Sequence, residues 1–343
     1  MRNVTLGKSG ITVPQNGFGA LPIQRVSTEE AVAILRRAYE GGMRYFDTAR
    51  AYSDSEEKLG EAFSGYIDRE KIYIATKTQA KDADRFFKDL ELSLSKLKTD
   101  YIDVYQLHMA PQCFRPGDGT GLYEAMLEAK DKGLIRHIGI TAHKIGVAEE
   151  IATSGLYETL QYPFSYLSSD RDIALADLCR ENNVGFIAMK GLAGGLITDS
   201  KAAMAFMTEH DNVVPIWGIQ KPSELEEWLS YMDDTPELDD EMKAFIAKER
   251  EELSGDFCRG CGYCMPCPAG ITINQCARMS QMVRRAPSAY WLSDYWQKEM
   301  EKINGCLNCR ACTKKCPYEL DTPALLRKNY EDYQNILSGK VKV

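Results

Sequence analysis

Short apolar stretches alternate with amphipathic stretches along the first two thirds of the chain. Each apolar stretch has the length and composition of a buried strand, and each amphipathic stretch has helical spacing. The predicted strands are centred near Phe18, Phe46, Ile74, Val104, Ile138, Leu160, Ile187 and Ile216. Eight strand–helix units in succession predict a closed parallel (β/α)8 barrel of the TIM type rather than an open sheet.

The predicted helices carry recognisable start signals. Ser27 and Glu30 have the spacing of a capping box, and Ser223 and Glu226 repeat that spacing near the end of the pattern. Residues 4–13 precede the first strand and resemble a small hairpin. In a barrel, such a hairpin is expected to close the bottom face.

Composition and charge narrow the function classes. The chain has 343 residues, of which 44% are hydrophobic and 27% charged, and its formal net charge is -8. This balance is that of an ordinary globular protein, and it argues against nucleic acid or an anionic membrane as partner. No apolar run reaches the roughly 18 residues of a membrane span, and the polar start lacks the apolar core of a signal peptide. We therefore expect a cytoplasmic protein.

Eight of the eleven cysteines form two runs near the C-terminus. In a reducing compartment, such a pattern favours a metal or cluster site over disulfides. The second run, Cys306, Cys309, Cys312 and Cys316 followed by Pro317, has the spacing of bacterial two-cluster ferredoxins, in which the last cysteine binds the other cluster. The first run is one residue shorter before its last cysteine, and it comprises Cys258, Cys261, Cys264 and Cys267, followed by Pro268.

The reciprocal pattern predicts two 4Fe-4S clusters. One set of ligands is Cys258, Cys261, Cys264 and Cys316, and the other is Cys306, Cys309, Cys312 and Cys267. Two zinc sites are the alternative, but zinc requires neither a third cysteine at i+6 nor a proline after the fourth.

The segment between the cysteine runs has helical apolar spacing interrupted at Pro287, and it contains several aromatic residues. We expect a small, mostly helical ferredoxin-like domain whose aromatic residues cover the clusters. The predicted organisation is a barrel over residues 1–232, a connecting helix over 233–255 and the cluster domain over 256–343.

Polar residues stand where consecutive barrel strands end. Asp47, Lys77 and His108 close three predicted strands, and Tyr52 lies in the loop after Asp47. In parallel barrels the chemistry takes place at this C-terminal face. Taken singly, each residue is as well explained by a cap or a structural role, but together they indicate an active site.

The sequence resembles the aldo-keto reductase family. The resemblance is carried by "YFDTARAYSDSEEKLGEAF", by Lys77 in "IYIATKT" and by His108 in "DVYQLH", and it extends to about residue 230. The cysteine-rich part resembles the subset of this family that has an iron-sulfur tail.

The resemblance implies an oxidoreductase that reduces a small aldehyde or ketone. Tyr52 is implied as the general acid and His108 as the residue that orients the carbonyl. A phenol has an unperturbed pKa of about 10, and a nearby ammonium lowers it. Lys77 is implied to act in this way, with Asp47 holding Lys77.

The implied hydride source is NAD(H) or NADP(H), bound without a Rossmann turn. Loops after the seventh and eighth strands are expected to hold its phosphates. Glu224 stands where NADP-dependent members place an arginine, so NAD is at least as plausible as NADP. The cofactor-binding candidates are Thr141, His143, Gln161, Met189, Lys190, Gly191, Gly218, Lys221, Ser223 and Glu224.

Two further hypotheses stay open at this point. Electrons from a ferredoxin or flavoprotein partner would enter through the clusters without a nicotinamide, or the barrel would serve only as a scaffold for an electron carrier. The clusters are equally compatible with a structural and a redox role.

Overall fold

The computed structural model describes residues 1–253, 257–285, 288–316 and 318–342. It divides into two compact units. The first comprises Met1–Gly191 and Asp199–Lys243, and the second comprises Leu192–Thr198 and Ala244–Val343. The second unit thus includes a short segment from within the first two hundred residues.

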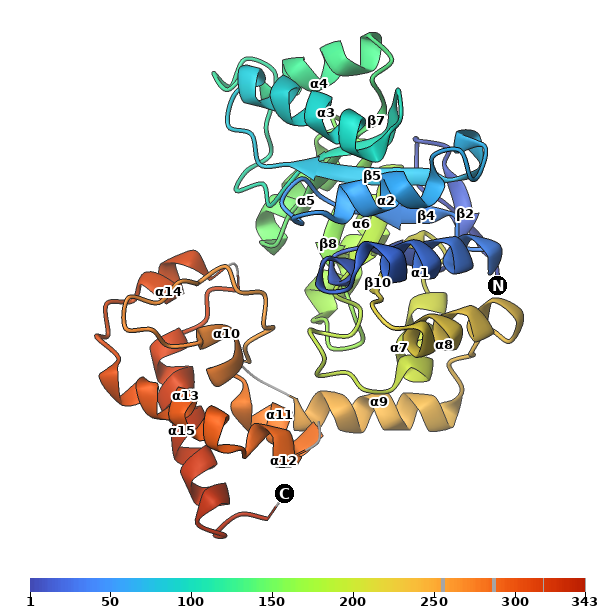
Figure 1. Cartoon of the computed structure of the whole chain (residues 1–343). Coiled ribbons are helices and arrows are strands. Elements are labelled where there is room, and N and C mark those ends of the chain that lie inside the picture. Colours follow the sequence, from blue (N-terminus) through green and yellow to red (C-terminus); the bar gives the residue numbers. More distant parts are fainter. Residues whose placement is uncertain (254–256, 286–287, 317, 343) are drawn as a thin grey trace. The chain divides into compact units, whose positions relative to one another are not determined.

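The first unit is a closed barrel of eight parallel strands, in the order β10-β3-β4-β5-β6-β7-β8-β9 (Figure 1). All eight predicted strands are present, which confirms the predicted TIM barrel. The strands are β3 (Gly17–Gly19), β4 (Tyr45–Asp47), β5 (Tyr73–Thr78), β6 (Ile102–Leu107), β7 (Ile135–Thr141), β8 (Thr159–Pro163), β9 (Gly185–Met189) and β10 (Val213–Gly218).

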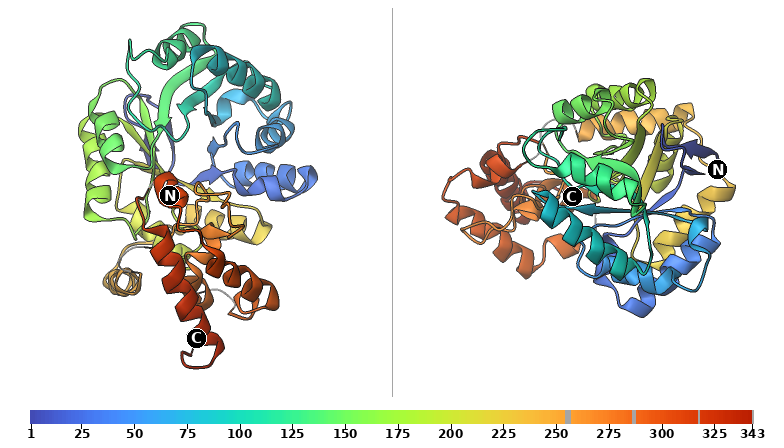
Figure 2. Two further views of the ribbon diagram at one scale, coloured as in Figure 1. Left: turned by 90° about the vertical axis from the view of Figure 1, so that its left-hand side faces the viewer. Right: turned by 90° about the horizontal axis from the view of Figure 1, so that it is seen from above.

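Helices lie around the outside of these strands, as the left view in Figure 2 shows. The first of them begins at the predicted capping box, because the Ser27 side chain accepts from Glu30 N and the Glu30 carboxylate accepts from Ser27 N. The helices of this unit are α1 (Thr28–Glu40), α2 (Ser55–Phe63), α3 (Ala83–Leu97), α4 (Leu122–Asp131), α5 (Ile145–Thr153), α6 (Asp170–Glu181), α7 (Ser200–Thr208) and α8 (Pro222–Asp233), with short 3-10 turns η1 (Pro22–Arg25) and η2 (Arg69–Lys71).

The predicted hairpin is also present. Strands β1 (Asn3–Thr5) and β2 (Thr12–Pro14) pair antiparallel. Val4 and Val13 of this hairpin are buried in one hydrophobic cluster with Tyr45, Val104 and Val214 of the barrel strands. The hairpin therefore fills the end of the barrel opposite to the strand ends that carry the polar residues.

The second unit is helical in its described residues, as predicted, and ends in the long helix α15, visible in both views of Figure 2. Pro287 and Pro317 lie outside the described residues. Its helices are α9 (Asp240–Glu252, which begins at the edge of the first unit), α10 (Ile273–Cys276), α11 (Met279–Arg285), α12 (Ser288–Trp291), α13 (Asp294–Glu301), η3 (Lys302–Gly305), α14 (Ala311–Lys315) and α15 (Thr322–Leu337).

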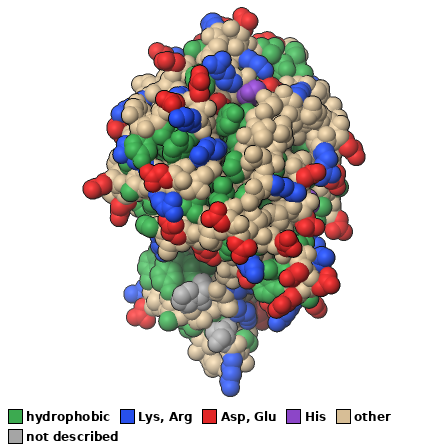
Figure 3. Space-filling view, turned by 90° about the vertical axis from the view of Figure 1, so that its right-hand side faces the viewer, with side chains coloured by type: hydrophobic (Ala, Val, Ile, Leu, Met, Phe, Trp, Pro, Cys, Tyr) green, Lys and Arg blue, Asp and Glu red, His purple; other side chains and the backbone are tan. Residues whose placement is uncertain are grey.

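The surface carries charges of both signs. On the face drawn in Figure 3, acidic and basic side chains are interspersed. In the described part of the chain, no helix is long and apolar enough to cross a membrane.

Candidate functional site

A buried ion pair lies at the C-terminal ends of β4 and β5. Lys77 Nζ donates to Asp47 Oδ1 at 2.6 Å and to the Thr48 carbonyl oxygen at 2.6 Å. The two residues are 1% and 2% exposed. Burial raises the pKa of Asp47 and lowers that of Lys77, and each partner's charge opposes the shift of the other. The pair holds the lysine side chain in one place.

A glutamine that the sequence analysis did not select completes this buried network. Gln106 is paired with Lys77 in the β5–β6 register, and its Nε2 atom donates to Asp47 Oδ2 at 3.4 Å and to Gln161 Oε1 at 3.0 Å. Its position as a polar residue inside the largely apolar strand "YIDVYQL" is the feature of the sequence that could have identified it. Gln106 links the ion pair to a predicted cofactor contact, Gln161.

Tyr52 and His108 meet beside the ion pair. Their rings contact edge to face, with centroids 5.8 Å apart, and Lys77 Nζ lies 5.4 Å from the centroid of the Tyr52 ring. Burial, together with the charges of Lys77 and Lys190, lowers the pKa of His108 to about 3. His108 is therefore neutral at pH 7, and its buried Nδ1 atom has no hydrogen-bond partner in the described part of the protein. The structure brings all four predicted catalytic residues together.

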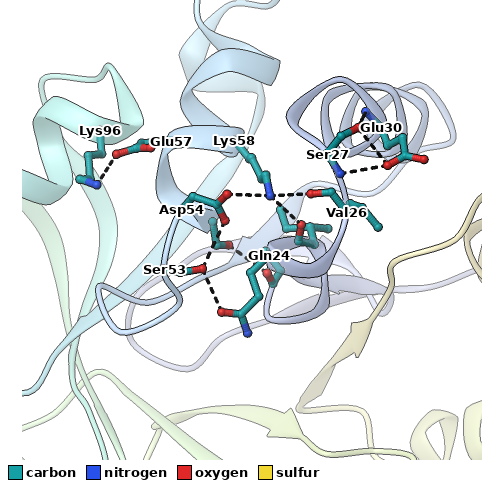
Figure 4. A network of polar contacts seen from close by, with 12 residues as sticks. Gln24, Val26, Ser27, Glu30, Ser53, Asp54, Glu57, Lys58 and Lys96 are labelled. Carbon is teal, nitrogen blue, oxygen red and sulfur yellow. Dashed lines mark hydrogen bonds and ion pairs between the residues drawn. The ribbon is translucent and has the colours of Figure 1, made fainter.

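A polar network fixes the loop that carries Tyr52 (Figure 4). Ser53 Oγ donates to Gln24 Oε1 at 3.1 Å. Lys58, at 2% exposure, lies 2.8 Å from the Asp54 carboxylate, and it donates to the carbonyl oxygens of Ile23 and Val26 at 3.1 and 2.8 Å. The loop after β4 is thus tied to the loop after β3, which restricts where the Tyr52 side chain can lie.

The predicted contacts of the nicotinamide carboxamide lie at the ends of β7 and β8. Thr141 is buried, and its hydroxyl accepts from Met109 N at 2.7 Å. Gln161 is buried one strand further on, paired with Thr141. Burial, with the charge of Lys190, lowers the pKa of His143 well below its ordinary value, so this side chain is also neutral at pH 7.

The predicted contacts after β9 begin with Met189, which ends that strand. Met189 and Lys190 are half-buried, and Gly191 is buried against the Trp217 ring. Lys190 contributes positive charge near His108 and His143. These residues lie on the same barrel face as the catalytic four.

The start of α8 differs from the predicted capping arrangement. Glu224 Oε2 accepts from the backbone N–H groups of Gln220 and Lys221 at 3.0 and 3.1 Å. Ser223 lies inside the helix, and Glu226 forms a bidentate pair with Arg37 instead. The predicted Ser223–Glu226 cap was wrong because the helix begins at Pro222, so that its N-cap is Lys221, two residues before Ser223. Gly218 is exposed at the end of β10.

The eight cysteines of the two runs gather around two cavities. Cys258, Cys261, Cys264 and Cys316 line one cavity. Cys306, Cys309, Cys312 and Cys267 line the other, and Cys264 lines this second cavity as well. Each predicted ligand set thus surrounds one cavity, including the fourth cysteine contributed by the opposite run.

The donor set fits a cluster that carries positive metal charge. Burial and the neighbouring Cys258 and Cys261 raise the pKa of Cys264 to about 12. Thiolates crowded in this way need an electron-poor centre to balance them, and 4Fe-4S clusters take four cysteines each.

The tryptophans of this unit do not line the cavities. Trp291 and Trp296 pack on each other, with ring centroids 4.7 Å apart. Tyr318, which follows the second cysteine run, is an aromatic residue that does line one of the cavities. The expectation that the aromatics between the cysteine runs cover the clusters was therefore wrong for these two residues.

Comparison with known families finds two matches along the chain. Residues 15–229 match the model of the aldo/keto reductase family, and residues 257–321 match that of the 4Fe-4S dicluster domain.

Individual relatives match the barrel part. "Aldo-keto reductase YhdN" of Bacillus subtilis (strain 168) is 29% identical over 215 residues, which is 58% of this chain and 64% of that protein. "Methylglyoxal reductase DkgB" of Salmonella typhi is 30% identical over 215 residues, or 60% of this chain and 76% of that protein. The chain thus spans slightly less than two thirds of YhdN and about three quarters of DkgB.

A solved structure matches the same part. The holo form of aldo-keto reductase AKR11C1 from Bacillus halodurans is 26% identical, with a TM-score of 0.62 over 73% of this chain and 96% of that one.

Proposed function

The chain belongs to the aldo/keto reductase family and carries a 4Fe-4S domain, and we propose that it reduces the carbonyl group of a small aldehyde or ketone with NADH or NADPH. The observation that carries this proposal is the meeting of Tyr52, His108 and the Lys77–Asp47 pair at one face of the barrel. A phenol, a neutral imidazole and a buried ammonium in this arrangement suit proton delivery to a carbonyl oxygen.

The bound nicotinamide would supply a hydride to the carbonyl carbon. Tyr52 donates its proton to the carbonyl oxygen, so that hydride and proton together convert C=O to an alcohol. The phenolate that remains is stabilised by the nearby Lys77 ammonium and regains its proton from water. His108, neutral because its pKa is about 3, donates an N–H to the carbonyl oxygen and orients it without adding a charge.

The residues at the barrel ends fit the nicotinamide cofactor. Thr141, His143 and Gln161 would hold the carboxamide, and Met189, Lys190 and Gly191 would line the ring and the adjoining phosphate. Gly218, Lys221, Ser223 and Glu224 would lie at the adenosine end. All of these stand on strands β7 to β10, in the loops that follow β7, β9 and β10, or in the first turn of α8.

We infer a preference for NADH over NADPH. The Glu224 carboxylate already accepts the N–H groups of Gln220 and Lys221 at the start of α8. A 2'-phosphate placed there would meet a negative charge rather than free donors.

The eight cysteines are proposed as ligands of two 4Fe-4S clusters, with the sets that line each cavity. A second candidate function follows from their exposure. Cys309 is exposed, and the neighbouring Leu307 is 67% exposed. A ferredoxin or flavoprotein docking there would deliver electrons through the clusters.

The proposal is tested on anaerobically purified protein. NADH and NADPH are titrated against intrinsic fluorescence, and turnover on a panel of aldehydes and ketones is compared with that of Tyr52→Phe. The proposal predicts nucleotide binding by both proteins, tighter for NADH, and turnover only by the wild type. Wild-type protein that binds neither nucleotide would leave the cluster-fed reaction as the better account.

A further inference from the structure

One arginine of the second unit holds a segment that continues directly from the candidate cofactor residues. Arg278 lies between α10 and α11 and is 6% exposed. Its Nη1 atom donates to the carbonyl oxygen of Gly194 at 2.5 Å. Its Nε and Nη2 atoms donate to Gln275 Oε1 at 3.2 and 2.9 Å, which fixes the plane of the guanidinium.

The same guanidinium packs against the first cysteine run. A Cβ added to Gly260 would lie 2.6 Å from Arg278 Cζ, and a Cβ added to Gly194 would lie 2.6 Å from the Arg259 carbonyl oxygen. Both glycines have positive φ, +65° and +70°. The backbone of the cysteine run, the Arg278 guanidinium and the segment around Gly194 are therefore in close contact, with no room for a side chain at either glycine.

Two cysteines of the first run, Cys258 and Cys261, lie near this contact. Gly260 N donates to Cys258 Sγ at 3.4 Å, and the charges of Cys258 and Cys261 act on Arg278. A guanidinium beside the ligands of a thiolate-bound cluster is attracted by their negative charge. A change in the charge of these ligands therefore changes the electrostatic force on Arg278.

The segment held by Arg278 is Leu192–Thr198, which belongs to the second unit. It follows Met189, Lys190 and Gly191, the proposed nicotinamide contacts, without a break in the chain. A second arginine also holds it, because Arg285 donates to the Leu196 carbonyl oxygen at 3.2 Å and pairs with Glu249. Within the segment, Gly195 N and Ile197 N donate to the Leu192 carbonyl oxygen.

We propose that Arg278 is a positioning residue that links the loop of Cys258 and Cys261 to the segment Leu192–Thr198. When that loop holds its cluster, Arg278 sets the conformation of the segment. The conformation of the segment in turn sets the affinity for the nicotinamide nucleotide. The effect on affinity rests on the proposed function. The hold of Arg278 on the segment does not, because it is defined by contacts within the second unit alone.

The test is hydrogen–deuterium exchange of the 192–198 amides in cluster-loaded protein under anaerobic conditions, followed by NADH titration. Arg278→Gln keeps one hydrogen-bond donor but loses the positive charge and the several N–H donors of the guanidinium. Arg278→Lys keeps the charge. Arg284→Gln is the matched control, because Arg284 stands on the neighbouring helix and pairs with Asp332 rather than with the segment. Iron content and circular dichroism confirm that each variant is folded and loaded.

We expect Arg278→Gln to speed exchange of the Gly195 and Ile197 amides by about tenfold, which is the effect of losing one charged hydrogen bond. The affinity for NADH should fall by a similar factor. For Arg278→Lys, the exchange rate and the NADH affinity should lie between those of Arg278→Gln and the wild type. The control Arg284→Gln should match the wild type in both. Removal of the clusters with a chelator should have the same effect on both as Arg278→Gln.

The outcomes separate the two claims. Unchanged exchange in folded, loaded Arg278→Gln overturns the proposal, as does faster exchange with unchanged NADH affinity. Failure of the wild type to bind either nucleotide overturns the proposed function and the affinity claim with it. Faster exchange in that case would still establish the hold of Arg278 on the segment.

Discussion

Lys77 and Asp47 form an ion pair of 2.6 Å in which both side chains are almost completely buried. Breaking a buried pair from one side leaves an uncompensated charge, which costs about 3–5 kcal/mol. We expect Lys77→Met to lower the free energy of unfolding of the barrel by about this amount.

The double variant Asp47→Asn/Lys77→Met separates stability from catalysis. It removes both charges, so urea unfolding should show most of the stability recovered. Turnover should stay about 100-fold or more below the wild type, because the cation beside Tyr52 is missing. Recovery of turnover together with stability would contradict the role given to Lys77.

Lys58 offers a test of how the Tyr52 loop is held (Figure 4). Lys58→Met removes the contacts with Asp54 and with the carbonyl oxygens of Ile23 and Val26. We expect a fall in kcat of about tenfold, corresponding to about 1.4 kcal/mol, because Tyr52 becomes less well placed.

The matched control for Lys58 is Lys96→Met. Lys96, on α3, pairs with Glu57, which stands on α2 next to Lys58. The Lys96–Glu57 pair is more exposed than Lys58. Exposed pairs contribute about 0–1 kcal/mol, so stability and kcat should change little. Equal losses of kcat in the two variants would show that the Tyr52 loop does not depend on Lys58.

The pH dependence of stability should reflect the buried histidines. The pKa of His108 is about 3 in the folded protein, below its ordinary value of 6.5, and that of His143 is also lowered. The unfolded chain therefore binds more protons between these values, so stability is greatest above pH 6.5 and falls as the pH is lowered toward 3.

His108→Gln should remove part of this slope, about 1.4 kcal/mol per pH unit for one proton. The measurement is the urea midpoint of wild type and variant between pH 4 and 7. A variant whose midpoint falls as steeply as that of the wild type would mean that His108 is not the neutral buried group described here.

The crossed assignment of the cysteines makes its own prediction. Cys316→Ser should disturb the same cluster as Cys258→Ser, so combining them should cost little more than either alone. Cys267→Ser combined with Cys316→Ser should disturb both clusters, with iron falling well below the roughly eight atoms of two 4Fe-4S clusters. Cys179→Ser, in the barrel, is the control. Iron analysis that shows the opposite pairing would exclude the crossed arrangement.

The parts of the fold that could be predicted depend on local patterns. Eight strands, the hairpin and the Ser27–Glu30 cap are encoded in short stretches whose spacing is diagnostic. Asp47, Lys77 and His108 were found because strand ends meet at one face of a parallel barrel.

What could not be predicted depends on contacts between distant residues. Gln106 and Lys58 become important only because the fold buries them beside partners from other loops. Glu224 rather than Glu226 caps α8, since the helix start is decided by the loop after β10. The grouping of Leu192–Thr198 with the cysteine-rich unit leaves no trace in its own composition.

Hydride transfer in the barrel can be followed with NADH and NADPH that carry deuterium at the transferable position of the nicotinamide ring. Cluster-loaded protein is supplied with each nucleotide and an accepted carbonyl substrate, and the alcohol is analysed by mass spectrometry. If the nicotinamide is the hydride donor, the wild type will place one deuterium on the former carbonyl carbon, and Tyr52→Phe will form almost no product. An alcohol without deuterium, formed only when a reduced ferredoxin or flavoprotein is present, would contradict hydride transfer in the barrel.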